Sequence, residues 1–407
     1  MSDFRKMPGK RSAAIAPSIL REMNQRVLLD LLFTSGPATR PQLGRITGLS
    51  QPTVIAALAD LEKLDLVRPC GRTTSAPGRA PMLYEVNPSV GAVVGVDIGR
   101  KWIRLLVTDL AASRLSELTV RNTASDRNSL VEAVGQLVSK GIADAGLEPQ
   151  AITHTVIGSP GVYDADRSQL LYAANLPGWQ RSRVVKALDE RIGSAVTIDN
   201  DANLAALGEY TYGAGKSAQQ FVYLTIGTGV GVGIVMDGKL YRGFRGSAGE
   251  VGYLPIGREL PLTRRGRPQR GMLEESFGAA AVVERAQECG MTGPLTAEKV
   301  FTAAREGDTR ALESIVTEAR QLARVIASIC ALLDPELIVI GGGVGQNLDL
   351  LEPEMLTELA RLTPMRPTLG VGDLGREAVV LGAIAMGIER ARETIFESRT
   401  DRSYLPG

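Results

Sequence analysis

Residues 221–238 read FVYLTIGTGVGVGIVMDG, and this stretch decides the fold of the larger part of the chain. The apolar run Phe221–Ile226 predicts a buried strand, Gly227–Gly231 predicts a tight turn, and Val232–Met236 predicts the return strand. Because the glycines lead into a β-branched strand and not into a helix, they do not match a dinucleotide-binding fingerprint. The turn is either a plain glycine hairpin or one whose backbone amides face a phosphate.

The same plan occurs earlier in the chain. Residues 92–99 read AVVGVDIG, which predicts a buried strand, and Gly99, Arg100 and Lys101 form the turn before the return strand Ile103–Val107. The two units lie 128 positions apart, counted from Asp97 to Thr225. Two such units, each followed by mixed strand and helix patterns, predict a two-lobed α/β domain with a cleft between equivalent halves.

Polar residues occupy the segment between the two hairpins, where residues 198–203 read IDNDAN after an apolar run. A carboxylate at a strand end, such as Asp201, is well placed to accept a proton from a hydroxyl, and an amide such as Asn200 can bind a polyol. A helix cap rich in Asx residues is the alternative interpretation. Further on, Leu337–Val344 predicts a strand that runs into a glycine turn, which is either a nucleotide subsite or a plain connection to a helix.

The first part of the chain has a different pattern. Apolar residues recur at helical spacing within Met23–Phe33, Thr39 is placed to cap a short second helix, and Ser50 is placed to cap a third. The turn before the third helix contains Gly48. The buried stripe of the third helix is formed by Val54, Leu58 and Leu61. Short helices joined by a tight turn predict a helix-turn-helix.

Two strands are predicted after the third helix. Leu66–Arg68 and Met82–Val86 form a hairpin around a loop that contains Arg72 and Arg79. A helix-turn-helix with such a wing predicts DNA binding, in which the third helix reads base edges and the wing meets phosphates or the minor groove. The candidate DNA contacts are Arg40, Gln42, Ser50, Gln51, Thr53, Arg68, Arg72 and Arg79. The alternative is a protein-interaction module whose arginines are only solvated.

Composition agrees with two different partners. The 407 residues carry a net charge of +1, but residues 1–90 hold 12 basic against 7 acidic residues, which leaves 34 against 38 for the rest. A basic first part suggests a polyanion partner.

Three cysteines and a single histidine, His154, exclude a disulfide framework and any site that needs two imidazoles. The longest apolar run, Ala378–Ile388, has 11 residues and is too short to cross a bilayer, and the N-terminus lacks a secretory pattern, so we expect a cytoplasmic protein without a membrane partner.

These motifs resemble the ROK family (repressors, open reading frames and kinases), and its winged-helix transcriptional regulators in particular. The resemblance runs from about Met23 to Glu389 and is most specific in Asp199–Asn203 with Gly208–Glu209 and in Leu224–Gly252. It implies an actin-like, two-lobed sugar kinase fold of the ribonuclease H-like class, dimerisation through the large domain, and sugar binding between the lobes. By the same resemblance, Asp201 matches the catalytic base of the kinases. The positions matched to sugar binding are Asn175, Asn200, Asp201, Glu250, Tyr253 and Glu274.

Three departures from the family pattern weigh against kinase activity. The phosphate loop of the kinases reads Asp-x-Gly-Gly-Thr, whereas Asp97–Lys101 reads DIGRK, which puts a long side chain where the backbone must approach phosphate. The positions of the family's zinc ligands hold Tyr253, Arg265, Arg267 and Met272. None of these residues replaces the missing histidine and thiolates, so we expect no metal. The histidine replaced by Tyr253 also touches the sugar in the family, so the ligand site itself is altered.

We therefore expect four segments: a flexible basic N-terminus (1–20), a winged helix-turn-helix domain (21–88), an actin-like ROK domain (89–395) and a C-terminal tail (396–407). The expected protein is a sequence-specific transcriptional regulator, most simply a repressor, that is not an enzyme and uses no cofactor. Its expected partners are a double-stranded DNA operator, a sugar or sugar derivative, and further copies of itself in a homodimer or dimer of dimers. The alternatives are an ATP-dependent hexose kinase with an accessory winged helix, and a regulator whose sugar pocket is vestigial.

Overall fold

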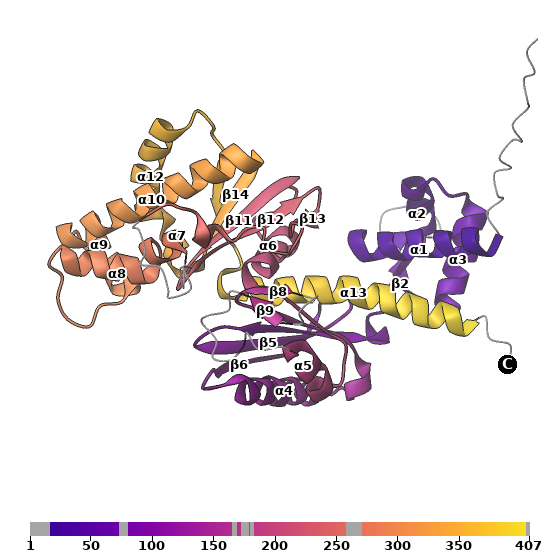
Figure 1. The fold of residues 1–407 in the computed structure, drawn as a ribbon. Helices are drawn as coiled ribbons and strands as arrows, with labels where there is room; N and C mark the ends of the chain where they lie inside the picture. Colours follow the sequence, from indigo (N-terminus) through magenta and orange to yellow (C-terminus); the bar gives the residue numbers. More distant parts are fainter. Residues whose placement is uncertain are drawn as a thin grey trace, which may run out of the picture. The chain divides into compact units, whose positions relative to one another are not determined.

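The structure of the chain is a computed structural model that describes residues 17–72, 80–164, 169–171, 179, 183–257 and 271–403. It divides into two compact units, whose elements are labelled in Figure 1. The smaller unit takes in the described residues up to Gly91, Asp109–Ala111 and those from Arg392 onward, and the larger unit takes in the rest. No helix in the described part of the chain is long and apolar enough to cross a bilayer.

The described N-terminal part of the smaller unit folds into α1, α2 and α3 and a three-stranded antiparallel sheet of order β1-β3-β2. Thr39 and Gln42 form a capping box at the start of the second helix, Gly48 ends it with φ 72°, and Ser50 caps the third helix, as predicted. The stripe formed by Val54, Leu58 and Leu61 is fully buried. The bounds are α1 Pro17–Ser35, β1 Ala38–Thr39, α2 Arg40–Thr47, α3 Gln51–Lys63, β2 Val67–Arg72 and β3 Met82–Val86.

The last helix of the chain, α13 (Ala378–Ser403), supplies its residues from Arg392 onward to the smaller unit. Phe396 is buried there, and the Arg26 guanidinium lies 5.3 Å from the centroid of its ring. Arg392 stacks on Phe33 at 3.9 Å. Residues 396–403, expected to be a tail, therefore continue helix α13, and Phe396 is buried in the smaller unit. The sequence pattern alone does not show what Phe396 packs against. At the other end, α1 begins at Pro17, inside the expected flexible segment.

In its described part, the larger unit contains two five-stranded sheets, with the orders β10-β7-β4-β5-β6 and β13-β12-β11-β14-β15, and a small sheet of β8 (Val162–Asp164) and β9 (Gln169–Leu171). Each five-stranded sheet has two parallel pairs on one side of its central strand, β4 or β11. The duplicated hairpins are confirmed, and Ile226 pairs with Val230 across the second turn. The bounds are β4 Ala92–Ile98, β5 Trp102–Asp109, β6 Arg114–Arg121, β7 Ile152–Ser159, β10 Val196–Asn200, β11 Gln220–Ile226, β12 Val230–Met236, β13 Lys239–Leu240, β14 Leu337–Gly341 and β15 Thr368–Val371.

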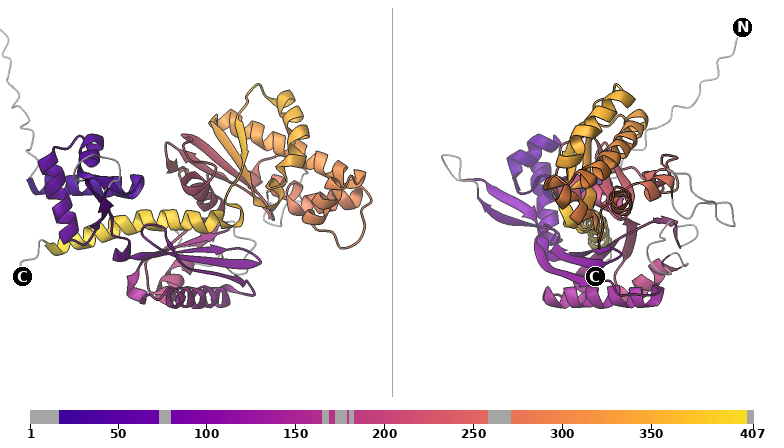
Figure 2. Two further views of the ribbon diagram at one scale, coloured as in Figure 1. Left: turned by 180° about the vertical axis from the view of Figure 1, so that it is seen from behind. Right: turned by 90° about the vertical axis from the view of Figure 1, so that its left-hand side faces the viewer.

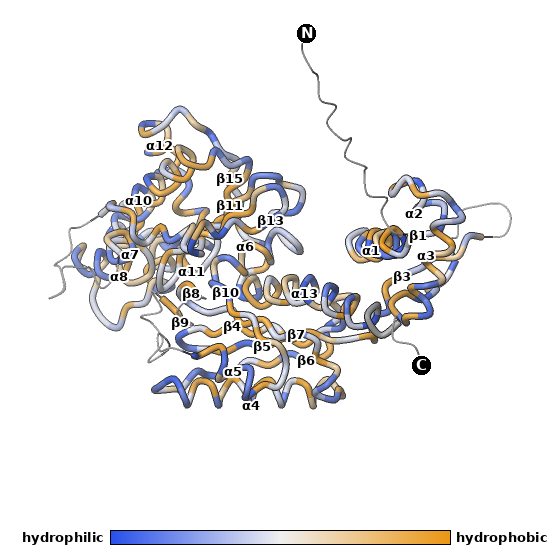
Figure 3. Tube along the Cα trace, turned by 45° about the vertical axis from the view of Figure 1, so that its right-hand side comes forward, coloured by the Kyte–Doolittle hydropathy of each residue, from blue (hydrophilic) through white to orange (hydrophobic). Residues whose placement is uncertain are grey.

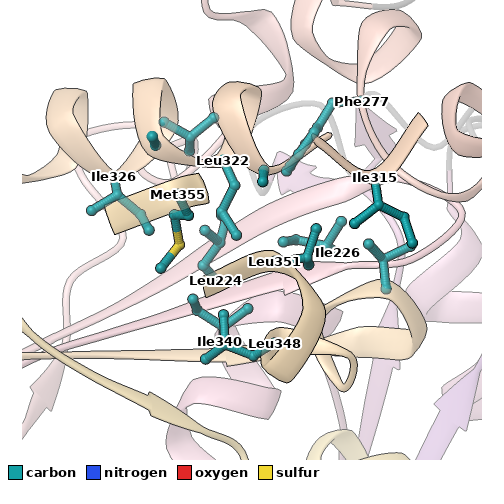
Figure 4. Close-up of a cluster of buried hydrophobic side chains, with 14 of the residues drawn as sticks. Leu224, Ile226, Phe277, Ile315, Leu322, Ile326, Ile340, Leu348, Leu351 and Met355 are labelled. Carbon is teal, nitrogen blue, oxygen red and sulfur yellow. The ribbon is translucent and has the colours of Figure 1, made fainter. Parts of the chain in front are cut away.

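Helices cover both sheets. α4 (Arg127–Asp144) and α5 (Val184–Ile192) pack against one face of the first sheet (Figure 2), and hydrophilic and hydrophobic residues alternate along the turns of α4 (Figure 3). The long helix α10 (Thr309–Leu333) and α12 (Leu348–Leu362) share a core with the second sheet. Figure 4 shows this core, in which Leu322, Ile326, Leu351 and Met355 from the helices meet Leu224, Ile226 and Ile340 from the strands.

Glycines bring the backbone of α6 (Asp201–Tyr212) unusually close to its neighbours. A Cβ at Gly382 of α13 would overlap the carbonyl oxygen of Leu204, and a Cβ at Gly208 would overlap that of Ala378. On its other side, a Cβ at Gly233 of β12 would overlap the carbonyl oxygen of Ala202. Because backbone atoms cannot move aside as a flexible side chain can, these positions admit only glycine.

We expect Gly382→Ala to lower the free energy of unfolding by about 1–3 kcal/mol, because the added methyl must push two helix backbones apart. Chemical denaturation followed by circular dichroism measures this. The matched control is Gly343→Ala, since a Cβ at Gly343 meets no atom within 4 Å and should change stability by less than about 0.5 kcal/mol. Equal stability of the two variants would contradict the close approach.

Candidate functional site

A cavity of about 280 Å³ lies in the larger unit between the two hairpin turns. This volume is slightly below the range of about 300–1,000 Å³ that is usual for small-molecule sites. Its walls come from the two turns, the start of α6, the loop after β13 and α7 (Met272–Ser276). The polar side chains among its lining residues are Arg100, Asn200, Asp201, Thr225, Thr228, Glu250, Tyr253 and Glu274. Five of the six predicted sugar-binding residues are thus brought together, and the sixth, Asn175, lies outside the described residues.

Asp201 is the first residue of α6, directly after β10. Asn200 is the N-cap: its Oδ1 accepts from the backbone N–H of Ala202 at 2.9 Å, and its Nδ2 donates to the carbonyl oxygen of Gly161 at 3.2 Å. The side chain that was expected to bind a polyol therefore also serves as the helix cap. Burial raises the pKa of the Asp201 carboxyl. Asp201 Oδ1 accepts from the Ala202 N–H at 2.9 Å, and the residue lines the cavity.

Asp199 fixes the loop that carries the next wall of the cavity. Its Oδ2 accepts two hydrogen bonds from the Arg242 guanidinium, at 2.9 and 2.7 Å, and its Oδ1 accepts from Asn203 Nδ2 at 3.0 Å. Arg242 lies four residues before Gly246, at the start of the loop that ends at Glu250. The sequence pattern places Asp199 beside Asp201 but does not reveal that Asp199 is a structural residue, because its partner lies 43 positions away.

Glu250 presents its carboxylate to the cavity. The preceding residue, Gly249, has φ 89°, and a Cβ there would overlap the carbonyl oxygen of Val232, so only glycine allows this loop to lie against β12. Within the described residues, the Glu250 carboxylate accepts no hydrogen bond. Burial, together with the charges of Asp201 and Glu274, raises the pKa of Glu250 to about 7. A buried carboxyl without a protein donor is suited to bind a ligand hydroxyl.

The first hairpin holds a pair that the sequence analysis missed. Asp97, at the end of β4, accepts a hydrogen bond from Arg104 Nη1 on β5 at 2.8 Å. Burial raises the pKa of Asp97 to about 6, although the Arg104 charge opposes this. The sequence contains a signal for this pair, because residues 97 and 104 face each other across the predicted hairpin. The negative charge of Asp97 is thus balanced inside the protein.

Glu274 and Tyr253 complete the wall of the cavity. Glu274 lies on α7, and a Cβ at Gly229 would lie 3.1 Å from its Oε1, so the carboxylate borders the second turn. Tyr253 is 40% exposed and lines the same cavity. Within the described residues, no group of three His, Cys, Asp or Glu is placed to hold a metal. Arg265 and Arg267 lie outside the described residues, so the prediction of no zinc stays a prediction.

In the smaller unit, several predicted DNA contacts also have partners within the fold. Arg40 donates to the Tyr84 hydroxyl and stacks on its ring at 5.0 Å, and Gln42 Oε1 accepts from the Thr39 N–H at 2.8 Å. Arg68 pairs with Glu85 at 2.9 Å. Ser50 and Thr53 hydrogen-bond each other at 2.8 Å, and Gln51 and Arg72 are exposed. Arg79 lies outside the described residues.

Duplicated sheets, a cleft with carboxylates and a glycine turn define an actin-like domain of the sugar kinase type. The ROK family model matches residues 93–390, and the chain belongs to the ROK family. The resemblance found in the sequence motifs is confirmed.

Relatives of two kinds are found. The chain is 27% identical over 392 residues to the xylose repressor of Caldicellulosiruptor bescii, which covers 91% of this chain and 96% of the relative. It is 30% identical to the glucokinase of Halalkalibacterium halodurans over 71% of this chain and 92% of that enzyme. Among solved structures, a ROK family transcriptional regulator described as a homolog of the E. coli MLC protein has a TM-score of 0.76, 19% identity and 93% coverage of this chain and 98% of its own, which shows a shared fold. The ROK hexokinase of Thermus thermophilus has a TM-score of 0.62 and 29% identity, and it covers 74% of this chain and 99% of its own.

The raised pKa of Glu250 predicts a pH dependence of stability. Between about pH 4.5 and 7 the folded chain keeps a proton that the unfolded chain releases, so the free energy of unfolding falls as the pH rises. We expect Glu250→Gln, which is neutral at every pH, to reduce this slope and to raise the melting temperature above pH 7. Thermal unfolding from pH 4.5 to 8 measures this, with the exposed Glu352→Gln as control. If the melting temperature of Glu250→Gln changed with pH in the same way as that of the wild type, the raised pKa of Glu250 would be contradicted.

Proposed function

We propose that the protein is a sequence-specific DNA-binding transcriptional regulator, most simply a repressor, whose larger unit senses a sugar or sugar derivative. The proposal depends on the combination of two features in one chain. The smaller unit has the capped helices α2 and α3 and the β2–β3 hairpin, and the ROK domain has a cavity lined with carboxylates. The similarity to a protein named xylose repressor over 91% of the chain supports it. A ligand shifts operator affinity by no more than its differential affinity for the two states.

In this proposal, the smaller unit is a winged helix-turn-helix domain, and α3 enters the major groove. Gln51 is exposed at the start of α3, and Ile55 is 45% exposed one turn later. An apolar side chain in this place suits contact with a thymine methyl group, so part of the specificity would come from shape and from the wing. A homodimer or dimer of dimers would place two such helices on the half-sites of an operator.

The wing is expected to supply phosphate contacts through Arg72 and Arg79. Because each phosphate contact contributes about 0.9 to the dependence of log Kd on log salt concentration, Arg72→Ala with Arg79→Ala should lower that slope by up to about 2 and weaken binding to all sequences. Fluorescence anisotropy on the DNA next to the protein's own gene, from 50 to 200 mM salt, measures this. The control is Lys186→Ala with Arg361→Ala, two exposed charges of the larger unit. An unchanged slope in the wing variant would remove the wing from the interface.

A second candidate function is an ATP-dependent sugar kinase, which Asp201 in the cavity and the 30% identity to a glucokinase favour. Arg100 opposes it, because its side chain stands where the resemblance requires the second glycine of the phosphate loop. We expect no phosphorylation of glucose or xylose in a coupled ATP assay, with the purified protein at micromolar concentration. Turnover that Asp201→Asn abolishes would establish the kinase instead.

A further inference from the structure

The exposed face of α3 carries few hydrogen-bonding groups. In the first two turns of this helix the exposed residues are Gln51, Pro52, Ile55 and Ala56, and three of these four side chains are apolar. Ile55 is 45% exposed and lies one turn after Gln51, on the same side of the helix. A surface of this kind distinguishes base pairs through apolar contact and hardly at all through hydrogen bonds.

The polar side chains around the start of α3 are engaged in helix caps. The hydroxyls of Ser50 and Thr53 lie 2.8 Å apart in a hydrogen bond with each other, and Ser50 Oγ also accepts from the Thr53 N–H at 3.3 Å. At the start of α2, Gln42 Oε1 accepts from the Thr39 N–H at 2.8 Å. Turning any of these groups toward a base would break a cap and destabilise the helix that it begins.

The side chain of Gln51 is directed back toward α2. Its Nε2 donates to the carbonyl oxygen of Arg40 at 3.5 Å, and a Cβ at Gly44 would lie 2.7 Å from the same nitrogen. The carboxamide of Gln51 therefore lies over α2, at the side of the exposed face. Ile55 is the largest apolar side chain on this face within the first two turns of α3.

The major groove offers one apolar group to such a side chain. This group is the C5-methyl of thymine, and the rest of each base edge presents hydrogen-bond donors and acceptors. Contact between the methyl group and an exposed isoleucine removes apolar surface of both from water. Deoxyuridine lacks the methyl group and keeps every hydrogen-bonding atom of thymine, whereas 5-methylcytosine carries a methyl group at the same ring position.

We infer that Ile55 determines operator specificity by contact with a C5-methyl group, and that the preferred half-site places a thymine against it. This inference deepens the DNA-binding role proposed above and rests on it. Because the contact involves only the methyl group, 5-methylcytosine at the same position makes it as well, so operator binding responds to cytosine-5 methylation. The arginines of the wing add affinity for every sequence, whereas Ile55 supplies a difference between sequences.

Substitution of single bases in the operator tests this inference. The full-length protein first selects its preferred duplexes from a random pool, and fluorescence anisotropy at one fixed salt concentration then measures Kd. Each thymine of a half-site is replaced in turn by deoxyuridine. We expect binding to weaken about 3-fold to 10-fold at the thymine that faces Ile55, which is the effect of one buried methyl group. At the same position, 5-methylcytosine should bind more tightly than cytosine by a similar factor.

The variant Ile55→Ala separates methyl contact from DNA shape. It should bind the thymine and deoxyuridine operators equally, because the side chain that touches the methyl group is gone. Ile55 is exposed and alanine is the best helix former, so the variant is expected to fold. The matched control is Ile19→Ala, the same change at an isoleucine of α1 that is 51% exposed, and it should keep the wild-type ratio. An effect of thymine on DNA shape would persist in Ile55→Ala and would refute the contact.

The outcomes distinguish this inference from the proposed function. If an operator is selected but deoxyuridine binds as tightly as thymine at every position, the methyl contact is refuted and the regulator stands. Equal binding of cytosine and 5-methylcytosine by the wild type has the same consequence. If no duplex is selected from the pool, the regulator and the methyl contact are both refuted. A deoxyuridine effect that Ile55→Ala removes and Ile19→Ala retains supports both.

Discussion

Backbone contact around α6 is the constraint on which the pocket depends. Glycines at 208, 233 and 382 let this helix touch β12 on one side and α13 on the other, without side chains between the backbones. Because Asp201 begins α6 and Asn200 caps it, the position of the helix sets the position of the carboxylate. Gly249 brings the loop with Glu250 against the same strand, β12. One close-packed layer therefore fixes the positions of Asp201 and Glu250.

Patterns confined to a few consecutive residues predicted the elements that bear the site. The caps Thr39 and Ser50, the buried stripe of α3 and both glycine hairpins lie where the sequence placed them. Such features are set by hydrogen bonds and hydrophobic periodicity within one turn or one hairpin, so a single sequence contains the information. The duplicated order of the two sheets follows from the same local units, since each hairpin starts an equivalent half.

Partners distant in the sequence could not be predicted in this way. Asp199 with Arg242, and Arg40 with Tyr84, are joined by the tertiary fold. For Asp199, any of the 46 Lys and Arg residues is an equally good candidate partner in the sequence. The same limit applies to α13, whose residue Phe396 finds its contacts near α1 only after folding. Charged side chains that looked available for DNA or sugar are in part used to hold the fold, because a buried or half-buried charge needs a partner.

The charges at the first hairpin bear on whether the ROK domain binds a ligand or turns over a substrate. Arg104 gives Asp97 a counter-ion within the same hairpin, and Arg100 adds a second positively charged residue to the lining of the cavity. Fixed charge favours binding at equilibrium, because the site is already organised before the ligand arrives. It does not favour turnover, since an interaction equally strong with substrate, transition state and product leaves the barrier unchanged and retains the product. A positive charge at position 100 therefore agrees with the sugar-sensing role proposed for this domain.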